Sequence, residues 1–173
     1  MAINYLKKGK TDAAKAIDDA QVSEIVKNTL KAIEERGDEA VKEFAKKFDN
    51  YTPESFKLSQ AEIDNLINQV SKQDLEDIKF AQEQVRNFAQ AQRDSMQDIE
   101  VETMPGVILG HKNIPVQSVG CYIPAGKFPM VASAHMSVVT ASVAKVPRII
   151  ACTPPYQGSP NPAVIAAMHF GGA

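Results

Sequence analysis

The character of the chain changes near residue 100, and this change constrains the fold more than any other feature. Before it, apolar residues recur at helical spacing, and the glycines are Gly9 and Gly37. After it, glycines and prolines cluster between short runs of apolar and β-branched residues. The two patterns favour helices first and strands later. We therefore predict an α/β protein with a helical region over 1–100 and a mixed region over 101–173.

The first region has the pattern of several amphipathic helices. One apolar stripe ends where Gly37 is placed to terminate a helix, and its members are Val22, Ile25, Val26, Thr29, Leu30 and Ile33. A shorter helix is predicted around Val41 and Phe44. Ser59 with Glu62 has the form of a capping box, and Ser71 with Asp74 offers another helix start. The charged residues of these helices are expected to face solvent.

The second region alternates strands and helices. The Pro105-Gly106 turn between two apolar runs predicts a hairpin. Buried strands are then predicted over 116–123 and 148–153, with helices over 133–144 and from Asn161-Pro162 to Gly171-Gly172. This order predicts a Rossmann-like parallel sheet, in which ligands bind beyond the carboxyl ends of the strands. Because so small a sheet leaves an unpaired edge, we expect 101–173 to be the first part of a domain that is cut before its next strand.

Charge and composition exclude several classes of function. The formal net charge is −2, and lysines alternate with acids, so we expect no nucleic-acid partner. Met1–Lys10 lack the apolar core of a signal peptide, and no apolar run is long enough to span a bilayer, which predicts a cytoplasmic protein without membrane contact. Cys121 and Cys152 lie in apolar runs and are predicted to be buried free thiols. Local spacing provides no metal site.

One segment closely resembles a known family. The run Val119-Gly120-Cys121-Tyr122-Ile123-Pro124-Ala125-Gly126 is similar to the strand and glycine turn of histidinol dehydrogenases, where the pattern is near Val-Gly-x-Tyr-Val-Pro-Gly-Gly. Further matches follow in the same order along the chain: Arg36-Gly37-Asp38-Glu39-Ala40, Lys47-Phe48-Asp49, Phe88 with Gln92, Pro105-Gly106-Val107, Pro115, Ser133 with Met136, and Thr153-Pro154-Pro155. The resemblance covers essentially the whole chain.

The resemblance implies the N-terminal part of an NAD-dependent, zinc-dependent alcohol dehydrogenase. Such enzymes are typically homodimers that oxidise L-histidinol through the aldehyde to L-histidine, as a step of histidine biosynthesis. Their zinc ligands and Glu-His acid/base pair lie in later segments, so it implies no catalytic or metal-binding residue here, and a chain inactive alone. It places Tyr122 in contact with NAD, and Gly126 could let the backbone approach the cofactor. The alternative for Tyr122 is a core residue with one hydrogen bond.

Several positions depart from the family pattern, among them Ala125, Ser142, Lys145 and Pro147. Ala125 replaces the first glycine of the pair and would strain a turn that needs a positive φ. Lys145 replaces a glycine before the next strand. The segment from Lys127 to Met136 is closer to the divergent branch that includes sulfopropanediol dehydrogenases, where His135 could help hold an anionic group of the substrate. The alternative for His135 is a packed histidine with one hydrogen bond.

Two other readings of function stay open. Within the same family, the small-molecule substrate could be a sulfonated diol instead of histidinol. In a different class, the same strand, turn and helix could form a non-catalytic domain that binds a nucleotide or a partner subunit. A purely structural helical module would leave the turn from Tyr122 to Gly126 without a purpose.

Overall fold

The computed structural model describes Gly9 and residues 11–173, which form two compact units divided between Thr52 and Pro53. The segment Met1–Lys10, on which the prediction of cellular location depends, lies outside the described residues except for Gly9. The compositional change near residue 100 falls inside the second unit, because α3 (Gln60–Ile67) and α4 (Lys72–Asp94) pack with α7 (Pro162–Gly171). The assignment of 1–100 and 101–173 as domains stays a prediction.

The first unit is helical. Helix α1 (Asp12–Arg36) ends at Gly37, whose φ of 57° is costly for other residues, and α2 (Asp38–Phe44) continues into the π-helical turn η1 (Ala45–Asp49). An ion pair of 2.7 Å joins Arg36 to Glu43 across this corner. Most of the predicted apolar stripe of α1 is exposed within the unit, whereas Thr29 and Ile33 are half-buried; the exposed members are Val22, Ile25, Val26 and Leu30.

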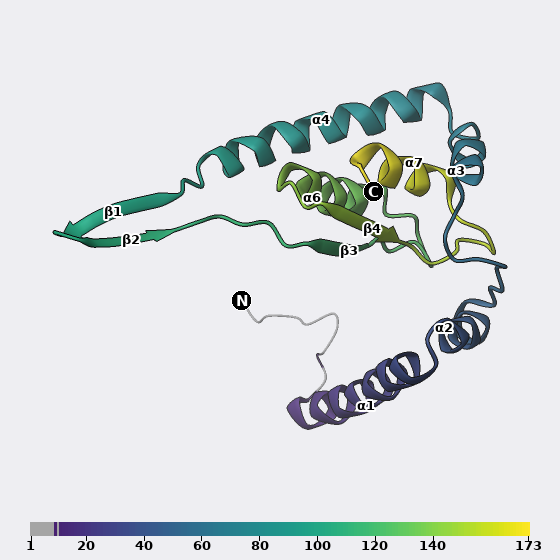
Figure 1. The fold of residues 1–173 in the computed structure, drawn as a ribbon. Helices are drawn as coiled ribbons and strands as arrows, with labels where there is room; N and C mark the ends of the chain where they lie inside the picture. Colours follow the sequence, from purple (N-terminus) through teal and green to yellow (C-terminus); the bar gives the residue numbers. More distant parts are fainter. Residues whose placement is uncertain (1–8, 10) are drawn as a thin grey trace, which may run out of the picture. The chain divides into compact units, whose positions relative to one another are not determined.

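The second unit opens with two capped helices (Figure 1). In α3 (Gln60–Ile67), the Ser59 hydroxyl accepts from the Glu62 backbone N–H, and the Glu62 carboxylate accepts from the Ser59 N–H, so the predicted capping box is confirmed. In α4 (Lys72–Asp94), the Ser71 hydroxyl accepts from the Asp74 N–H at 3.1 Å. The serine therefore fixes where this long helix begins.

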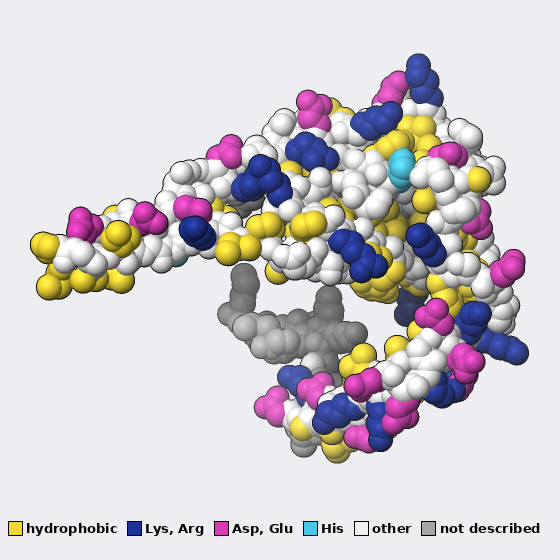
Figure 2. Space-filling model, in the orientation of Figure 1, with side chains coloured by type: hydrophobic (Ala, Val, Ile, Leu, Met, Phe, Trp, Pro, Cys, Tyr) yellow, Lys and Arg dark blue, Asp and Glu magenta, His cyan; other side chains and the backbone are white. Residues whose placement is uncertain are grey.

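The predicted hairpin is confirmed. Strand β1 (Ile99–Met104) pairs antiparallel with β2 (Val107–His111), and Gly106 has the positive φ of 79° that the turn uses. Every residue of both strands is exposed, and Figure 2 shows hydrophobic side chains gathered at the projecting tip. At its base, the Asp98 carboxylate accepts from the backbone N–H of Asn113 at 2.9 Å and from its side-chain amide at 3.2 Å.

The core of the second unit lies between a parallel strand pair and helices that cover one face of it (Figure 1). Strands β3 (Ser118–Tyr122) and β4 (Arg148–Cys152) pair in parallel, which confirms the predicted strand arrangement. Alternate residues such as Cys121 and Ile149 contribute to the core. The opposite face, with Tyr122, Ile150 and Cys152, is exposed among the described residues, so the prediction that both strands are buried was wrong for this face.

The two crossover segments agree with prediction in position and differ in detail. The first helix runs from α5 (Val131–Ala134) through the π-helical segment η2 (His135–Val139) to α6 (Thr140–Val143). Helix α7 (Pro162–Gly171) begins as predicted, since the Asn161 side chain accepts from the Val164 N–H at 3.1 Å, and it ends at Gly172 with a φ of 110°. The largest fully buried side chains, Ile123, Val138, Val139 and Val164, all lie in this unit.

The two cysteines differ in environment. Both are free thiols, but Cys121 is buried and Cys152 is exposed. The prediction of burial was therefore wrong for Cys152, because it lies on the uncovered face of the sheet. Within the described part of the chain, no helix combines the length and apolar character that a membrane span requires.

Candidate functional site

The turn after β3 is held at both ends. The Ile123 backbone N–H donates to the Cys152 carbonyl oxygen at 2.8 Å, which extends the strand pairing by one residue. The Met130 N–H donates to the Pro124 carbonyl oxygen at 3.1 Å and closes the loop ahead of α5. Ile123 and Ala125 are buried and anchor the turn in the core. The backbone from 123 to 130 is therefore a fixed platform at the carboxyl end of the sheet.

Tyr122 lies at the start of this platform and points away from the core. Its side chain is 63% exposed, and its hydroxyl has no hydrogen-bond partner within residues 11–173. In the strand register it stands beside Cys152. The geometry therefore differs from that of a core tyrosine with a satisfied hydroxyl, and it leaves both a flat ring and a donor free for a ligand.

The glycine of the turn and its altered neighbour are both unstrained. Neither Ala125 nor Gly126 has a positive φ. A Cβ added to Gly126 would lie 3.7 Å from Pro154 Cγ, which is ordinary van der Waals contact. Ala125 therefore causes no backbone strain here, and no described residue lies close enough to require glycine at 126. What Gly126 provides is a short stretch of backbone without a side chain.

His135 lies in the core rather than at the turn. It is 7% exposed, and its Nδ1 lies 3.3 Å from Nε2 of Gln82 in α4, whose amide also donates to the Ala167 carbonyl oxygen at 2.7 Å. Burial lowers the pKa of His135 below its ordinary value of 6.5, so the neutral ring accepts at Nδ1 from the Gln82 amide. This is the geometry of a packed histidine with one hydrogen bond, and the structure does not bring His135 together with Tyr122.

Cys152 was not identified as a site residue from the sequence. Its position beside Tyr122 follows from the register of β3 and β4, which joins segments 30 residues apart (Tyr122 and Cys152). The pKa of its thiol is raised by partial burial and by the neighbouring Cys121 thiol. The thiol form is therefore favoured, and Cys152 is poorly suited to act as a nucleophile.

A metal site would need several Cys, His, Asp or Glu side chains close together, at the turn or elsewhere in either unit. Among the residues that the structure describes, no group of three or more His, Cys, Asp or Glu side chains is arranged to hold a metal ion. The sulfur, nitrogen and carboxylate ligands that zinc prefers are therefore not gathered there, and the described residues do not form a zinc site.

The fold and the turn define the class of this protein. The parallel pair β3 and β4, covered by helices and followed by a turn at the carboxyl end of β3, makes the second unit an α/β unit with a small parallel sheet. The model of the family described as histidinol dehydrogenase matches residues 12–173. The chain therefore belongs to the histidinol dehydrogenase family, whose members are oxidoreductases.

Individual relatives carry different names. A histidinol dehydrogenase homolog from Shouchella clausii is 53% identical, over 98% of this chain and 40% of the relative. Sulfopropanediol 3-dehydrogenase from Ruegeria pomeroyi is 42% identical, over 100% of this chain and 39% of the relative. The crystal structure of histidinol dehydrogenase from Elizabethkingia anophelis matches with a TM-score of 0.80 and 25% identity, over 97% of this chain and 36% of that one. The chain thus spans about 40% of the length of the curated relatives that it matches.

Proposed function

We propose that this chain is the cofactor-contacting N-terminal part of an NAD-dependent, zinc-dependent alcohol dehydrogenase, with Tyr122 as the main cofactor contact. The observation that carries the proposal is the exposed Tyr122 side chain at the carboxyl end of a parallel strand, whose hydroxyl bonds to none of the described residues. Its ring offers a stacking surface and its hydroxyl a hydrogen bond to ribose or phosphate. The backbone at Gly126 borders the same turn and allows close approach of the ligand.

In the whole enzyme, a bound nicotinamide cofactor would supply the hydride acceptor for oxidation of the alcohol, and Tyr122 and Gly126 would contact it from this chain. We propose that the part of this chain is to bind and orient the cofactor, because the resemblance places the zinc ligands and the acid/base pair in later segments of the family, and the described residues form no metal site. We therefore propose that this chain binds NAD but does not oxidise an alcohol alone. The homodimeric state and the cytoplasmic location stay predictions that rest on the resemblance and on the sequence.

For the substrate we propose L-histidinol, oxidised through the aldehyde to L-histidine, with a sulfonated diol as the second candidate. A specific comparison supports the second: the chain is 42% identical to a sulfopropanediol 3-dehydrogenase and 35% identical to a histidinol dehydrogenase from Methanosarcina mazei. His135 does not favour either one, because its ring is packed against Gln82 in the core.

Calorimetric titration of the chain with NAD tests the cofactor contact. Tyr122→Phe removes the hydroxyl alone and should weaken binding by roughly two- to tenfold, whereas Tyr122→Ala also removes the ring and should weaken it about tenfold or more. Tyr156→Phe is the matched control, since it deletes a hydroxyl outside the turn. Equal losses from Tyr122→Phe and Tyr156→Phe, or no saturable NAD binding by the unaltered chain, would refute the contact.

A chimera tests the substrate. Residues 12–173 would replace the matching part of the Shouchella clausii relative, which gives a protein of full family length. NAD reduction is then measured with L-histidinol and with 2,3-dihydroxypropane-1-sulfonate, with and without added zinc. Turnover of one alcohol selects that branch. If the chimera folds and binds NAD but oxidises neither alcohol, both substrate proposals fail while the cofactor proposal stands.

A further inference from the structure

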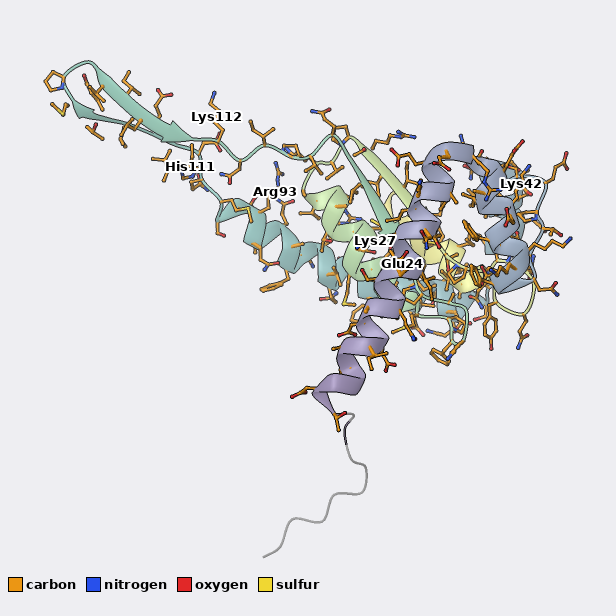
Figure 3. The ribbon with its side chains drawn as sticks, turned by 90° about the horizontal axis from the view of Figure 1, so that it is seen from below. Glu24, Lys27, Lys42, Arg93, His111 and Lys112 are labelled. Atoms are coloured by element: carbon orange, nitrogen blue, oxygen red, sulfur yellow. The ribbon has the colours of Figure 1, made fainter. Side chains whose placement is uncertain are left out.

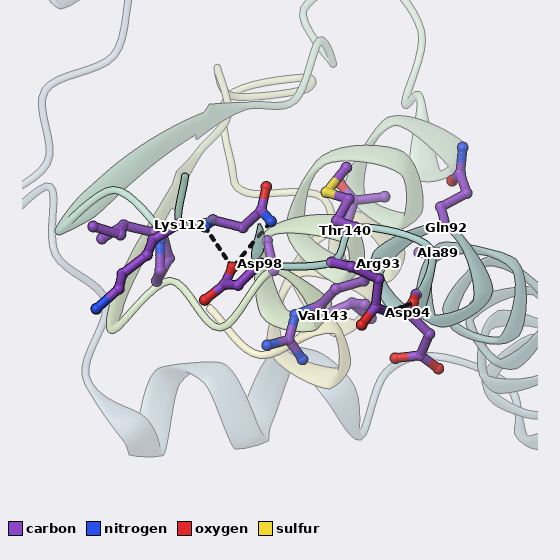
Figure 4. Close-up of a pocket in the computed structure, with 14 residues that line it drawn as sticks. Ala89, Gln92, Arg93, Asp94, Asp98, Lys112, Thr140 and Val143 are labelled. Carbon is purple, nitrogen blue, oxygen red and sulfur yellow. Dashed lines mark hydrogen bonds between the residues drawn. The ribbon is translucent and has the colours of Figure 1, made fainter. Parts of the chain in front are cut away.

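A cavity separate from the turn lies in the second unit, between the end of α4, the base of the hairpin and α6 (Figure 4). Its volume is about 910 Å³, which is within the range of small-molecule sites. The walls combine apolar side chains such as Ile114 and Val143 with polar and charged ones. Neither Tyr122 nor Gly126 lines it, so it is not the proposed cofactor site.

The charged side chains that line this cavity differ in whether they have hydrogen-bond partners. The Asp98 carboxylate accepts two hydrogen bonds from Asn113, which are the main reason that its pKa is lowered (Figure 4). The Asp94 carboxylate accepts from the Gln90 amide at 2.6 Å. Both acids of the wall are therefore hydrogen-bonded by neutral amides, and Lys112 adds a smaller electrostatic contribution at Asp98.

Arg93 is the half-buried cation of the wall. Its side chain makes no hydrogen bond or ion pair within residues 11–173. Lys112, on the segment that leaves the hairpin, lines the same cavity and likewise has no ion pair in that range (Figures 3 and 4). A guanidinium that is partly withdrawn from water gains most from an oxyanion that accepts two parallel N–H bonds.

We propose that this cavity binds a small organic monoanion, in which a carboxylate is held by Arg93 and an apolar body rests against Ile114 and Val143. The wall carries two cations, Arg93 and Lys112, and two carboxylates, Asp94 and Asp98, so its formal charge is balanced. A balanced wall suits a singly charged carboxylate better than a doubly charged phosphate. The planar guanidinium also matches the planar carboxylate.

Titration of the ¹⁵N-labelled full chain, followed by amide chemical shifts, tests this site. The probe is phenylacetate, with phenyl phosphate as the dianion and benzyl alcohol as the uncharged analogue. Phenylacetate should bind saturably with a Kd on the order of 1 mM, as expected of a ligand this small, and should shift amides at 89–98, 112–114 and 140–144. Tighter binding of phenyl phosphate would overturn the carboxylate assignment, and equal binding of benzyl alcohol would overturn the role of charge.

Substitutions test whether the Arg93 guanidinium itself binds the carboxylate, as opposed to the overall charge of the protein. Arg93→Gln should weaken phenylacetate binding about tenfold or more. Arg93→Lys should weaken it less, because lysine keeps the positive charge but loses the pair of parallel N–H donors. Arg86→Gln is the matched control, since Arg86 lies on the same helix but does not line the cavity. Ala144→Phe should block the space without changing charge, and a dispersed amide spectrum shows that each variant is folded. Equal weakening by Arg86→Gln and Arg93→Gln, or unchanged binding in Ala144→Phe, would refute the site.

Discussion

Gln82 links three helical segments through one buried amide, and its replacement by leucine should destabilise the second unit strongly. The side chain is 5% exposed and donates to His135 Nδ1 and to the Ala167 carbonyl oxygen. Gln82→Leu leaves both buried acceptors without this donor. At about 1–3 kcal/mol for each group left unpaired, the loss should total about 3 kcal/mol of unfolding free energy.

The partner variant separates hydrogen bonding from packing. His135→Leu removes one acceptor and should cost less, about 1–2 kcal/mol, because the Gln82 amide keeps its bond to Ala167. The double variant replaces both polar partners by apolar side chains, which is much cheaper than leaving one of them alone. Its cost should therefore fall short of the sum of the single costs by about 1–3 kcal/mol, the coupling expected of contacting residues.

Urea unfolding of the four proteins measures this coupling. Amide peaks from α4 and α7 would be followed, so that the helices of the first unit do not contribute to the signal. Strictly additive single costs would refute the reasoning, because they would mean that Gln82 and His135 do not depend on one another. A Gln82→Leu variant as stable as the parent would refute it as well.

Two further predictions concern the stability contributions of single residues, His135 and Lys145. Burial lowers the folded-state pKa of His135, so the unfolded chain binds the proton more readily. The contribution of His135 to the free energy of unfolding should therefore be constant above about pH 6.5 and fall as the pH decreases below it. Urea midpoints at pH 7.5 and 5.5 should therefore differ more in the parent than in His135→Leu, and an equal difference would exclude His135 as the cause. Lys145 has a φ of 59°, in the left-handed region, so Lys145→Gly should stabilise the second unit by about 1 kcal/mol in urea unfolding. Destabilisation by this change would show that the Lys145 side chain contributes more than its backbone costs.

The features that could be predicted from sequence are those set by a few consecutive residues. The capping box at Ser59, the N-cap at Asn161 and the Pro105-Gly106 hairpin turn each depend on hydrogen bonds or dihedral angles within about four residues. The alternation of strands and helices also predicted the parallel pairing of β3 with β4, since a helix between two strands is the usual connection of a parallel pair.

The features that could not be predicted depend on contacts between distant segments. Composition divides the chain near residue 100, but the compact units divide at Thr52 and Pro53, because α3 and α4 pack with α7. Cys152 lies in an apolar run, yet it is exposed, because the helices of this chain cover one face of the sheet. An apolar pattern shows which residues favour burial, and it does not show whether a covering layer is present.

The candidate site shows the same division. Tyr122 could be placed at the carboxyl end of a strand from the strand pattern together with the family resemblance, and its exposure fits a ligand contact. His135 was weighed as a substrate residue because it lies near the start of a predicted helix. Its actual environment is set by Gln82, 53 residues away, and no local pattern indicates that pairing. The cavity at Arg93 has the same origin, since its walls come from α4, the hairpin base and α6.

Two substitutions of family glycines illustrate how backbone geometry decides their cost. Ala125 is buried in an unstrained conformation, so its methyl group adds to the core and the turn beside Tyr122 keeps its shape. Lys145 has a left-handed backbone, where a side chain costs free energy, but it lies between α6 and β4 and not in the turn. The strain therefore falls on a connection between elements, and the platform proposed to meet the cofactor carries none at Ala125.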